Sequence, residues 1–277
     1  MAPLAEDGLP AVIFFDVDGT LIWDRAVDDP DNPIVNLKPT PAVYQAFDRL
    51  RENGHTAFIC TGRTLDTIHQ ALLDLHPAGI ISGAGACVSV GGKILAETSI
   101  PVDLLERTVG ELMRLGVDVV FEGAEQSVAL MKPGETYRDI PGVKTAHSWD
   151  ELREIAPNLD FEKFAFFASS IPVIKSDGAF FLAHFDLCDL GIGLAEMSLK
   201  GVDKGVGVRH ALEALGSAPR RTYAFGDSEN DLPMLREVDV PVAMGNALPQ
   251  VKDIASYVTG PVWEDGVVTG LEFLGLI

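Results

Sequence analysis

The chain has 277 residues, which is enough for a large hydrophobic core and for two domains or one large one. Its 41 acidic and 21 basic side chains give a formal net charge of −20, which argues against nucleic acid or an anionic membrane as the partner, because both attract cationic surfaces. An anionic substrate would therefore need a few local Lys or Arg side chains, or a bound metal ion, to hold it.

The first apolar run, Ala11–Phe15 (AVIFF), is typical of a strand that is buried on both faces of a parallel sheet. It ends at Asp16, and Asp18 follows two residues later, before Gly19 and Thr20. Ligands of open parallel sheets bind beyond the carboxyl ends of the strands. An ordinary strand exit also uses polar residues and glycine, but two acids behind a wholly apolar strand are costly to bury, so the pattern favours a functional site.

The segments that follow predict a βαβαβ unit. Residues 23–38 are polar and predict a surface segment. The next elements are a helix capped by Thr40 and ended by Gly54, a strand over 55–60 that ends at Thr61, Gly62 and Arg63, a helix over 64–75 and a short strand over 79–81.

A different pattern begins near Cys87 and predicts an inserted domain. Strands 87–90 and 93–96 form a hairpin around Gly91 and Gly92. They are followed by helices over 101–115 and 148–156 and by strands over 117–122, 127–131, 164–169, 179–185 and 191–197. This mixture predicts an antiparallel sheet that helices cover on one face. We therefore expect an α+β domain at 86–197 inserted into a core domain at 1–85 and 198–277.

The α/β pattern returns near residue 200. Asp203 can cap a helix over 204–215, and a strand over 222–225 leads through GDSENDLPML into another helix. Strands over 240–243 and 257–259 and a helix over 266–274 complete the chain. The predicted fold class is α/β, with a Rossmann-like three-layer core and a parallel sheet.

Four groups of polar residues should meet at one edge of this sheet, since three follow strands and one begins a helix. They are Asp16 with Asp18, Thr61, Lys204, and the run 226–231 that contains Asp227, Asn230 and Asp231. Crowded carboxylates have raised pKa values unless a cation lies between them. Oxygen ligands without clustered His or Cys favour Mg²⁺ over zinc.

Two interpretations of the run at 226–231 remain open. Asp231 lies one helical turn beyond Asp227, so both can face the same ion. Alternatively, Asp231 and Asn230 only cap the helix that begins there.

The quoted motifs resemble a known family. DVDGT at 16–20, TGR at 61–63, the Lys204 of VDKG and GDSEND at 226–231 are similar to the four ordered motifs of the haloacid dehalogenase-like (HAD) hydrolases. The large insertion, followed by AMGNA at 243–247 and EDGVVTGLE at 264–272, resembles the Cof-type phosphatase branch with a type IIB cap. One departure is Ala84, where many relatives carry Asn before the Gly-Ala pair that opens the cap.

The resemblance implies a Mg²⁺-dependent phosphatase that acts on a small phosphomonoester, such as a sugar phosphate. Asp16 would be the nucleophile that forms an aspartyl phosphate, and Asp18 would protonate the leaving oxygen and then deprotonate water. Mg²⁺ would be held by Asp16, the Asp18 carbonyl and Asp227, with Asp231 ligating or orienting it.

The resemblance also implies which residues meet the phosphate group. Lys204 would supply a second cation from a helix N-terminus, and Lys200 is a nearby rival. Thr61 would offer its hydroxyl and its backbone amide, next to Gly62, and Asn230 would also contact the phosphate. Arg63 would either contact the phosphate or bridge to an acid.

Two other functions stay open. One is a phosphomutase, or phosphosugar isomerase, that uses the same aspartyl phosphate. The other is a non-catalytic phosphometabolite-binding regulatory protein. The acid at Asp18 disfavours a dehalogenase, and the sequence does not predict the oligomeric state.

The cellular compartment is the last expectation. The cysteines Cys60, Cys87 and Cys188 are odd in number and widely spaced, which predicts no disulfide framework and a reducing cytoplasm. The first ten residues lack the pattern of a signal peptide, and the longest uncharged run, 75–92, suits turns rather than a membrane span.

Overall fold

The computed structural model describes residues 10–23, 38–140, 142–176, 179–190, 193–216 and 220–277. They form two compact units, the first within 1–63, 67–96 and 203–277 and the second within 64–66 and 97–202. Two expectations, the surface segment at 24–37 and the absence of a signal peptide at 1–9, concern residues outside these ranges.

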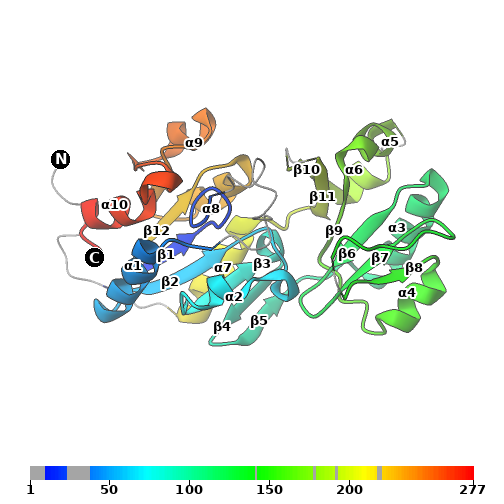
Figure 1. The fold of residues 1–277 in the computed structure, drawn as a ribbon, viewed down its shortest axis with the longest axis horizontal. Coiled ribbons are helices and arrows are strands. Elements are labelled where there is room, and N and C mark those ends of the chain that lie inside the picture. The colour runs from blue at the N-terminus through cyan, green and yellow to red at the C-terminus, as the bar shows by residue number, and fades with distance from the viewer. Residues whose placement is uncertain (1–9, 24–37, 141, 177–178, 191–192, 217–219) are drawn as a thin grey trace. The chain divides into compact units, whose positions relative to one another are not determined.

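The first unit is built on an eight-stranded sheet in the order β14-β13-β12-β1-β2-β3-β4-β5 (Figure 1). Strand β1 (Ala11–Phe15) lies between β12 (Arg221–Gly226) and β2 (Thr56–Cys60), parallel to both, and its five residues are buried. The other strands are β3 (Gly79–Ser82), β4 (Cys87–Val90), β5 (Lys93–Glu97), β13 (Val240–Ala243) and β14 (Tyr257–Val258). The predicted parallel sheet is therefore confirmed for the six strands from β14 to β3, which all pair in parallel.

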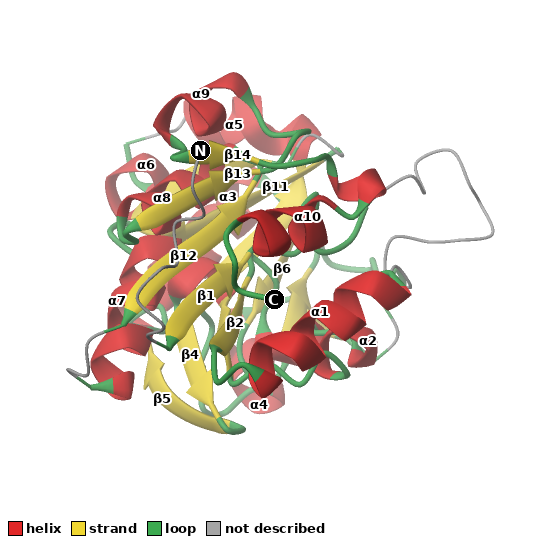
Figure 2. Ribbon diagram, turned by 90° about the vertical axis from the view of Figure 1, so that its left-hand side faces the viewer, coloured by secondary structure: helices red, strands yellow, loops and turns green. Residues whose placement is uncertain are grey.

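Helices cover both faces of this sheet (Figure 2). On one face lie α1 (Pro41–Glu52) and α10 (Gly266–Phe273), and on the other lie α7 (Lys204–Leu215) and α8 (Leu232–Arg236). Two further helices are α2 (Gln70–Leu73) and α9 (Pro249–Ile254), of which α9 was not expected. Thr40 caps α1 and Asp203 caps α7, as predicted.

The helix predicted over 64–75 is wrong in its extent. The segment contains a 3₁₀ turn at Leu65–Thr67 and the short helix α2. Between them His69 has an extended backbone, and its side chain accepts a hydrogen bond from the Ala71 amide. Thr64 Oγ1 also donates to Asp66 Oδ1 at 2.6 Å. Such local side-chain bonds compete with a continuous helix.

The hairpin at 87–97 belongs to the first unit, although the sequence suggested that it opens the insertion. β4 pairs antiparallel with β3, with Gly79 opposite Val90, and β5 follows at the sheet edge. Cys87 and Val88 are fully buried, so this apolar pair extends the core sheet. The units consequently change at residues 96–97 rather than at 85–86.

The second unit, drawn mostly in green in Figure 1, is an α+β domain with a six-stranded sheet in the order β10-β11-β9-β6-β7-β8. Its strands are β6 (Val119–Glu122), β7 (Ser127–Leu130), β8 (Lys144–Ala146), β9 (Lys163–Phe167), β10 (Phe185–Asp189) and β11 (Leu194–Leu199). Its helices are α3 (Val102–Leu115), α4 (Trp149–Ile155), α5 (Ile171–Ser176) and α6 (Phe181–His184). The expected antiparallel pairing is confirmed except for β7 and β8, which are parallel.

The strand predicted over 179–185 is wrong, because residues 181–184 form α6 and β10 begins only at Phe185. Phe181 and Phe185 are both fully buried. Short apolar runs do not distinguish a buried strand from a buried helical turn. Two further elements, α5 and β8, were not predicted; β8 (Lys-Thr-Ala) has only three residues and no apolar run.

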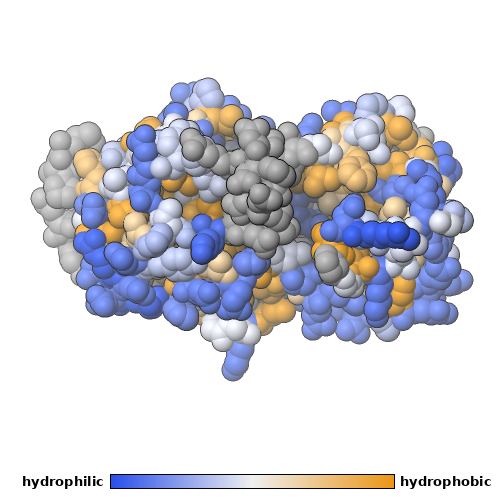
Figure 3. Space-filling model, viewed as in Figure 1, coloured by the Kyte–Doolittle hydropathy of each residue, from blue (hydrophilic) through white to orange (hydrophobic). Residues whose placement is uncertain are grey.

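Hydrophilic residues cover much of the described surface on the face shown in Figure 3, in keeping with the net charge of −20. Among the described helices, none has the length and hydropathy needed to cross a bilayer.

Candidate active site

Neighbouring strands carry the predicted site residues to one edge of the first sheet. Asp16 follows β1, Thr61 follows β2 and Asp227 follows β12, and these three strands are adjacent and parallel. The Asp16 amide donates to Phe225 O at 3.0 Å, so the strand pairing continues up to the carboxylate. The expected convergence is therefore present in the structure.

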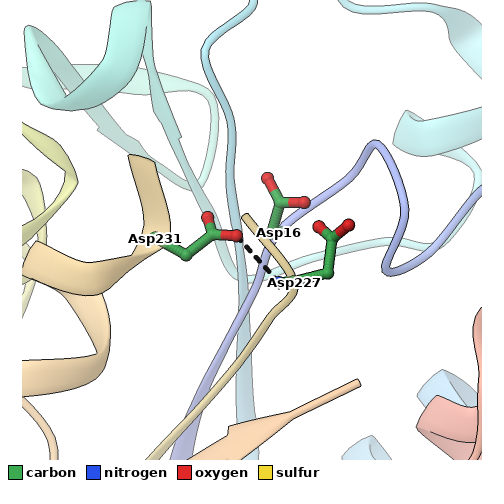
Figure 4. A group of neighbouring side chains, drawn as sticks. All are labelled: Asp16, Asp227 and Asp231. Carbon is green, nitrogen blue, oxygen red and sulfur yellow. Dashed lines mark hydrogen bonds between the residues drawn. The ribbon is translucent and has the colours of Figure 1, made fainter. Parts of the chain in front are cut away.

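Three carboxylates meet at this edge (Figure 4). Asp16, Asp227 and Asp231 each offer an oxygen, and these oxygens all lie within 4.8 Å of one another. Asp16 is 5% exposed and Asp231 is fully buried. A buried group of acids this dense requires a cation to compensate its charge.

Lys204 supplies one such cation from the first residue of α7. Its Nζ donates to Asp16 Oδ1 and to Asp231 Oδ1, both at 2.5 Å. Burial alone would lower the pKa of Lys204, but Asp16 and Asp231 outweigh it and raise that pKa well above its ordinary value. The rival Lys200 is exposed and belongs to the second unit. Lys204 is therefore the lysine that meets the carboxylates.

Asp231 is held in place through both of its oxygens. Oδ1 accepts from Lys204, and Oδ2 accepts from the amides of Asp227 and Ser228 at 2.9 and 3.0 Å. A Cβ at Gly226 would come within 2.7 Å of the Asp231 Cβ, so the glycine of the GDSEND motif is needed for this close approach. Asp231 thus fixes the turn after β12, and the helix-cap interpretation is correct in part.

Asp227 differs from Asp231 because one of its oxygens lacks a partner. Oδ2 accepts from Asn246 Nδ2 at 3.3 Å, whereas Oδ1 is buried and makes no hydrogen bond with any described residue. Burial and the neighbouring Asp231 raise the pKa of Asp227 to about 7. Burial and Asp231 also raise the pKa of Asp16. These hard oxygen donors and the orphaned Oδ1 fit a divalent cation such as Mg²⁺.

Arg63 makes a two-pronged ion pair with Asp18. Its Nε and Nη2 donate to Asp18 Oδ2 and Oδ1 at 3.2 and 2.7 Å. The Asp18 side chain is 50% exposed, in contrast to that of Asp16. Of the two expected roles for Arg63, the structure therefore shows the bridge to an acid.

Comparison with known proteins agrees with this geometry. The family model described as haloacid dehalogenase-like hydrolase matches residues 13–271. This chain belongs to the HAD-like hydrolases. It is 30% identical to the Bacillus subtilis protein named "Putative phosphatase YkrA", over 96% of this chain and 98% of that one.

Two further relatives carry more specific names. The hydrolase is 27% identical to a B. subtilis protein named 5-amino-6-(5-phospho-D-ribitylamino)uracil phosphatase YitU, over 95% of this chain and 97% of that one. Among solved structures, it matches the HAD subclass IIB sugar phosphatase BT4131 with a TM-score of 0.75 and 25% identity, over 96% of this chain and 100% of that one. The predicted family, fold class and enzyme class are thereby confirmed.

The Thr61 amide is not available to a phosphate in this hydrolase, contrary to expectation. It donates to Ile81 O at 2.8 Å as part of the pairing between the strands. The Thr61 hydroxyl accepts from the Arg63 amide at 3.2 Å and keeps its own proton to donate. Gly62 lies between Thr61 and Arg63 in the chain. The fourth expected phosphate contact, Asn230, uses its Oδ1 to accept from Ser228 Oγ at 2.6 Å.

The loop after β3 braces two parts of the hydrolase site. The amides of Gly83 and Ala84 donate to Arg63 O and Thr61 O at 2.8 and 3.0 Å. A Cβ at Gly85 would come within 1.9 Å of Asp203 O, so the backbone there lies directly against the cap of α7. This loop therefore connects the segment 61–63 with the helix start that carries Lys204.

Sequence reasoning gave no role to Asn246, which joins three segments of the hydrolase. Its side-chain amide donates to Gly19 O and Asp227 Oδ2 and accepts from the backbone N–H of Val262. The AMGNA motif contains it, but the motif alone does not reveal these partners.

Proposed function

We propose that this hydrolase is a Mg²⁺-dependent phosphatase that cleaves a small phosphomonoester, such as a sugar phosphate, through an aspartyl phosphate on Asp16. The observation that carries the proposal is the buried Asp16 carboxylate, whose Oδ1 accepts a hydrogen bond from Lys204 at 2.5 Å and which is grouped with the carboxylates of Asp227 and Asp231. The names of the relatives YkrA and BT4131 support the same reaction class.

Asp16, Asp227 and the backbone carbonyl of Asp18 would hold the metal ion. When bound, Mg²⁺ supplies positive charge that reduces the repulsion between an anionic nucleophile and a dianionic ester. We assign Asp231 the orienting role, because its two oxygens already accept from Lys204 and from the turn amides.

The first chemical step transfers the phosphoryl group to the protein. An oxygen of Asp16 attacks phosphorus in line, and the bond from phosphorus to the ester oxygen breaks. Asp18 gives its proton to the departing oxygen, which leaves as an alcohol. The two-pronged ion pair with Arg63 then holds the Asp18 carboxylate that this transfer leaves.

The second step releases phosphate. Asp18, now ionised, takes a proton from a water molecule, whose oxygen attacks phosphorus and breaks the bond to Asp16. The Asp16 carboxylate and the protonated Asp18 are thereby restored. Throughout both steps Lys204 stays protonated, because Asp16 and Asp231 raise its pKa. The Thr61 hydroxyl, Gly62 and Asn230 orient the phosphate oxygens.

The test is turnover of phosphorylated metabolites by the purified chain. With Mg²⁺, we expect phosphate release from simple monoesters without a bisphosphate activator, and loss of activity with a chelator. Asp16→Asn should lower kcat by more than about a thousandfold, because it removes the nucleophile. Asp48→Asn, on the exposed surface of α1, is the matched control and should leave kcat unchanged.

Three outcomes would contradict the proposal. If Asp16→Asn keeps more than about a tenth of the activity, its activation barrier has risen by less than about 1.4 kcal/mol, and another group must be the nucleophile. A requirement for a bisphosphate activator would indicate a phosphomutase. Inactivity across a broad panel of phosphate esters would indicate a binding protein.

A further inference from the structure

Asn246 uses both ends of its side-chain amide, and its partners come from three distant segments. Nδ2 donates to Gly19 O at 2.8 Å and to Asp227 Oδ2 at 3.3 Å. Oδ1 accepts from the Val262 amide at 2.9 Å. The turn after β1, the turn after β12 and the segment before α10 therefore meet at one side chain.

These contacts determine which way the amide faces. The Val262 N–H can only donate, so it selects the oxygen of Asn246, and the Gly19 carbonyl can only accept, so it selects the nitrogen. Since both backbone groups have fixed polarity, a flipped amide would lose two hydrogen bonds. The remaining Nδ2 proton is thereby directed at Asp227.

The consequence for Asp227 is an unequal pair of oxygens. Oδ2 is tethered by Asn246 and lies against the backbone of Gly19, where a Cβ would come within 2.3 Å of it. Oδ1 is buried without a hydrogen bond from any described residue, and the Asp227 carboxylate belongs to the group formed with Asp16 and Asp231. A carboxylate held in this way offers one defined oxygen to a cation.

We propose that Asn246 is a positioning residue for the divalent cation, which it serves by tethering Asp227 Oδ2 so that Oδ1 is presented to the ion. The inference rests on the proposed metal dependence of the hydrolase and adds a residue that never contacts the ion itself. Hydrogen bonds that orient ligands in this way usually contribute about ten- to a hundredfold to metal affinity.

A purely structural role for Asn246 is the competing explanation, and Asn53 provides the matched control. Asn53 Nδ2 donates to Leu276 O at 3.0 Å and ties the C-terminal residues to α1 within the same unit. Asn53→Ala therefore removes a comparable amide hydrogen bond that has no connection with the carboxylates.

The experiment is calorimetric titration of the metal-free full chain with MgCl₂, without substrate. We expect Asn246→Ala and Asn246→Ser each to weaken Mg²⁺ binding by about tenfold or more, and Asn53→Ala to leave the Kd within about twofold. In activity assays, the Mg²⁺ concentration for half-maximal rate should rise by the same factor for the Asn246 variants, while kcat recovers at saturating Mg²⁺.

The outcomes separate this inference from the proposed function. If the wild type binds Mg²⁺ and the Asn246 variants bind it equally well while only their Tm falls, as for Asn53→Ala, the inference is overturned and the metal-dependent function stands. If the wild type binds no Mg²⁺, both are overturned. If Asn246→Ala does not fold, Asn246→Ser decides, because it retains a small polar side chain.

Discussion

The raised pKa of Asp227 makes both the stability of the fold and its expected Mg²⁺ binding depend on pH. Burial and Asp231 raise it from the ordinary 3.8 to about 7 in the folded, metal-free chain. The folded chain therefore binds this proton more tightly than the unfolded chain does. The resulting contribution to the free energy of unfolding is fully present below the unfolded pKa and is lost as the pH rises through the folded pKa of about 7. Asp16, whose pKa is also raised, acts in the same direction.

Mg²⁺ should therefore bind more tightly, and stabilise the chain more, at pH 8 than at pH 6. The ion requires ionised ligands and must displace the proton from Asp227, which weakens binding by about tenfold per pH unit below the pKa. Calorimetry and the Tm gain at a fixed MgCl₂ concentration measure this. A Mg²⁺ affinity that is the same at pH 6 and pH 8 would contradict the expected coupling.

Arg63 should affect catalysis more than substrate binding. Its two hydrogen bonds hold a half-exposed Asp18 that otherwise has several side-chain orientations available. We expect Arg63→Gln to lower kcat by about ten- to a hundredfold with little change in KM, and Arg63→Lys not to restore it, since a lysine lacks the planar two-pronged geometry.

Arg51→Lys is the control for Arg63, because Arg51 pairs with Asp48 on the exposed side of α1. Its steady-state constants should equal those of the wild type. A rise in KM alone for the Arg63 variants would show instead that Arg63 contacts the phosphate of the substrate.

Residues whose position depends on a strand end could be predicted from the sequence. Asp16, Thr61 and Asp227 follow apolar runs, and parallel strands necessarily bring their ends together. Asn246 could not be found in this way, because its partners lie in segments far apart in the chain. The Thr61 amide was wrongly expected to bind phosphate. It donates to β3 instead, because the pairing between the strands extends one residue beyond the predicted strand.

At the scale of elements, the loop after β3 contains a strained position. Ala84 has φ 55° and ψ 33°, the left-handed conformation that alanine avoids and asparagine tolerates. The departure noted in the sequence, an alanine where the resemblance implies asparagine, therefore has a conformational cost.

Ala84→Asn should therefore raise the free energy of unfolding, by up to about 1 kcal/mol. Ala84→Val should lower it, because a β-branched residue is less tolerant of positive φ than alanine. Denaturant unfolding of the two variants beside the wild type measures both effects. Equal destabilisation by Asn and Val would show that crowding at this loop outweighs the backbone strain.

The boundaries of helices and strands were predicted well where the chain has a strong capping residue or an apolar pattern that repeats over several turns. They were predicted poorly in short segments. Thr40 and Asp203 cap α1 and α7 as expected, because a side-chain oxygen followed by apolar residues at helical spacing is a local signal. The continuous helix predicted over 64–75 does not form, because the side chains of Thr64 and His69 make local hydrogen bonds that compete with it. In the second unit, the run before Phe185 was too short for its period to distinguish helix from strand.

At the scale of the whole molecule, each unit has its own hydrophobic core. The core of the second unit gathers Phe121, Phe164 and Phe181 with other buried residues, and Trp149 packs against it. In the first unit Trp23 and Trp263 contact each other, with ring centroids 4.6 Å apart. The chain has three tryptophans, so the fluorescence of each unit can be observed separately.

We expect the two units to unfold in separate transitions, and Mg²⁺ to shift only that of the first. Ligands stabilise the unit that binds them, and Mg²⁺ at a hundred times its Kd contributes about 2.7 kcal/mol there. Trp149→Phe leaves only the first unit's tryptophans, whereas Trp23→Phe combined with Trp263→Phe leaves only Trp149. In urea, Mg²⁺ should move the fluorescence midpoint of the Trp149→Phe variant and leave that of the double variant unchanged. A single midpoint that Mg²⁺ moves equally in both variants would instead show that the two cores unfold as one cooperative body, despite their separate packing.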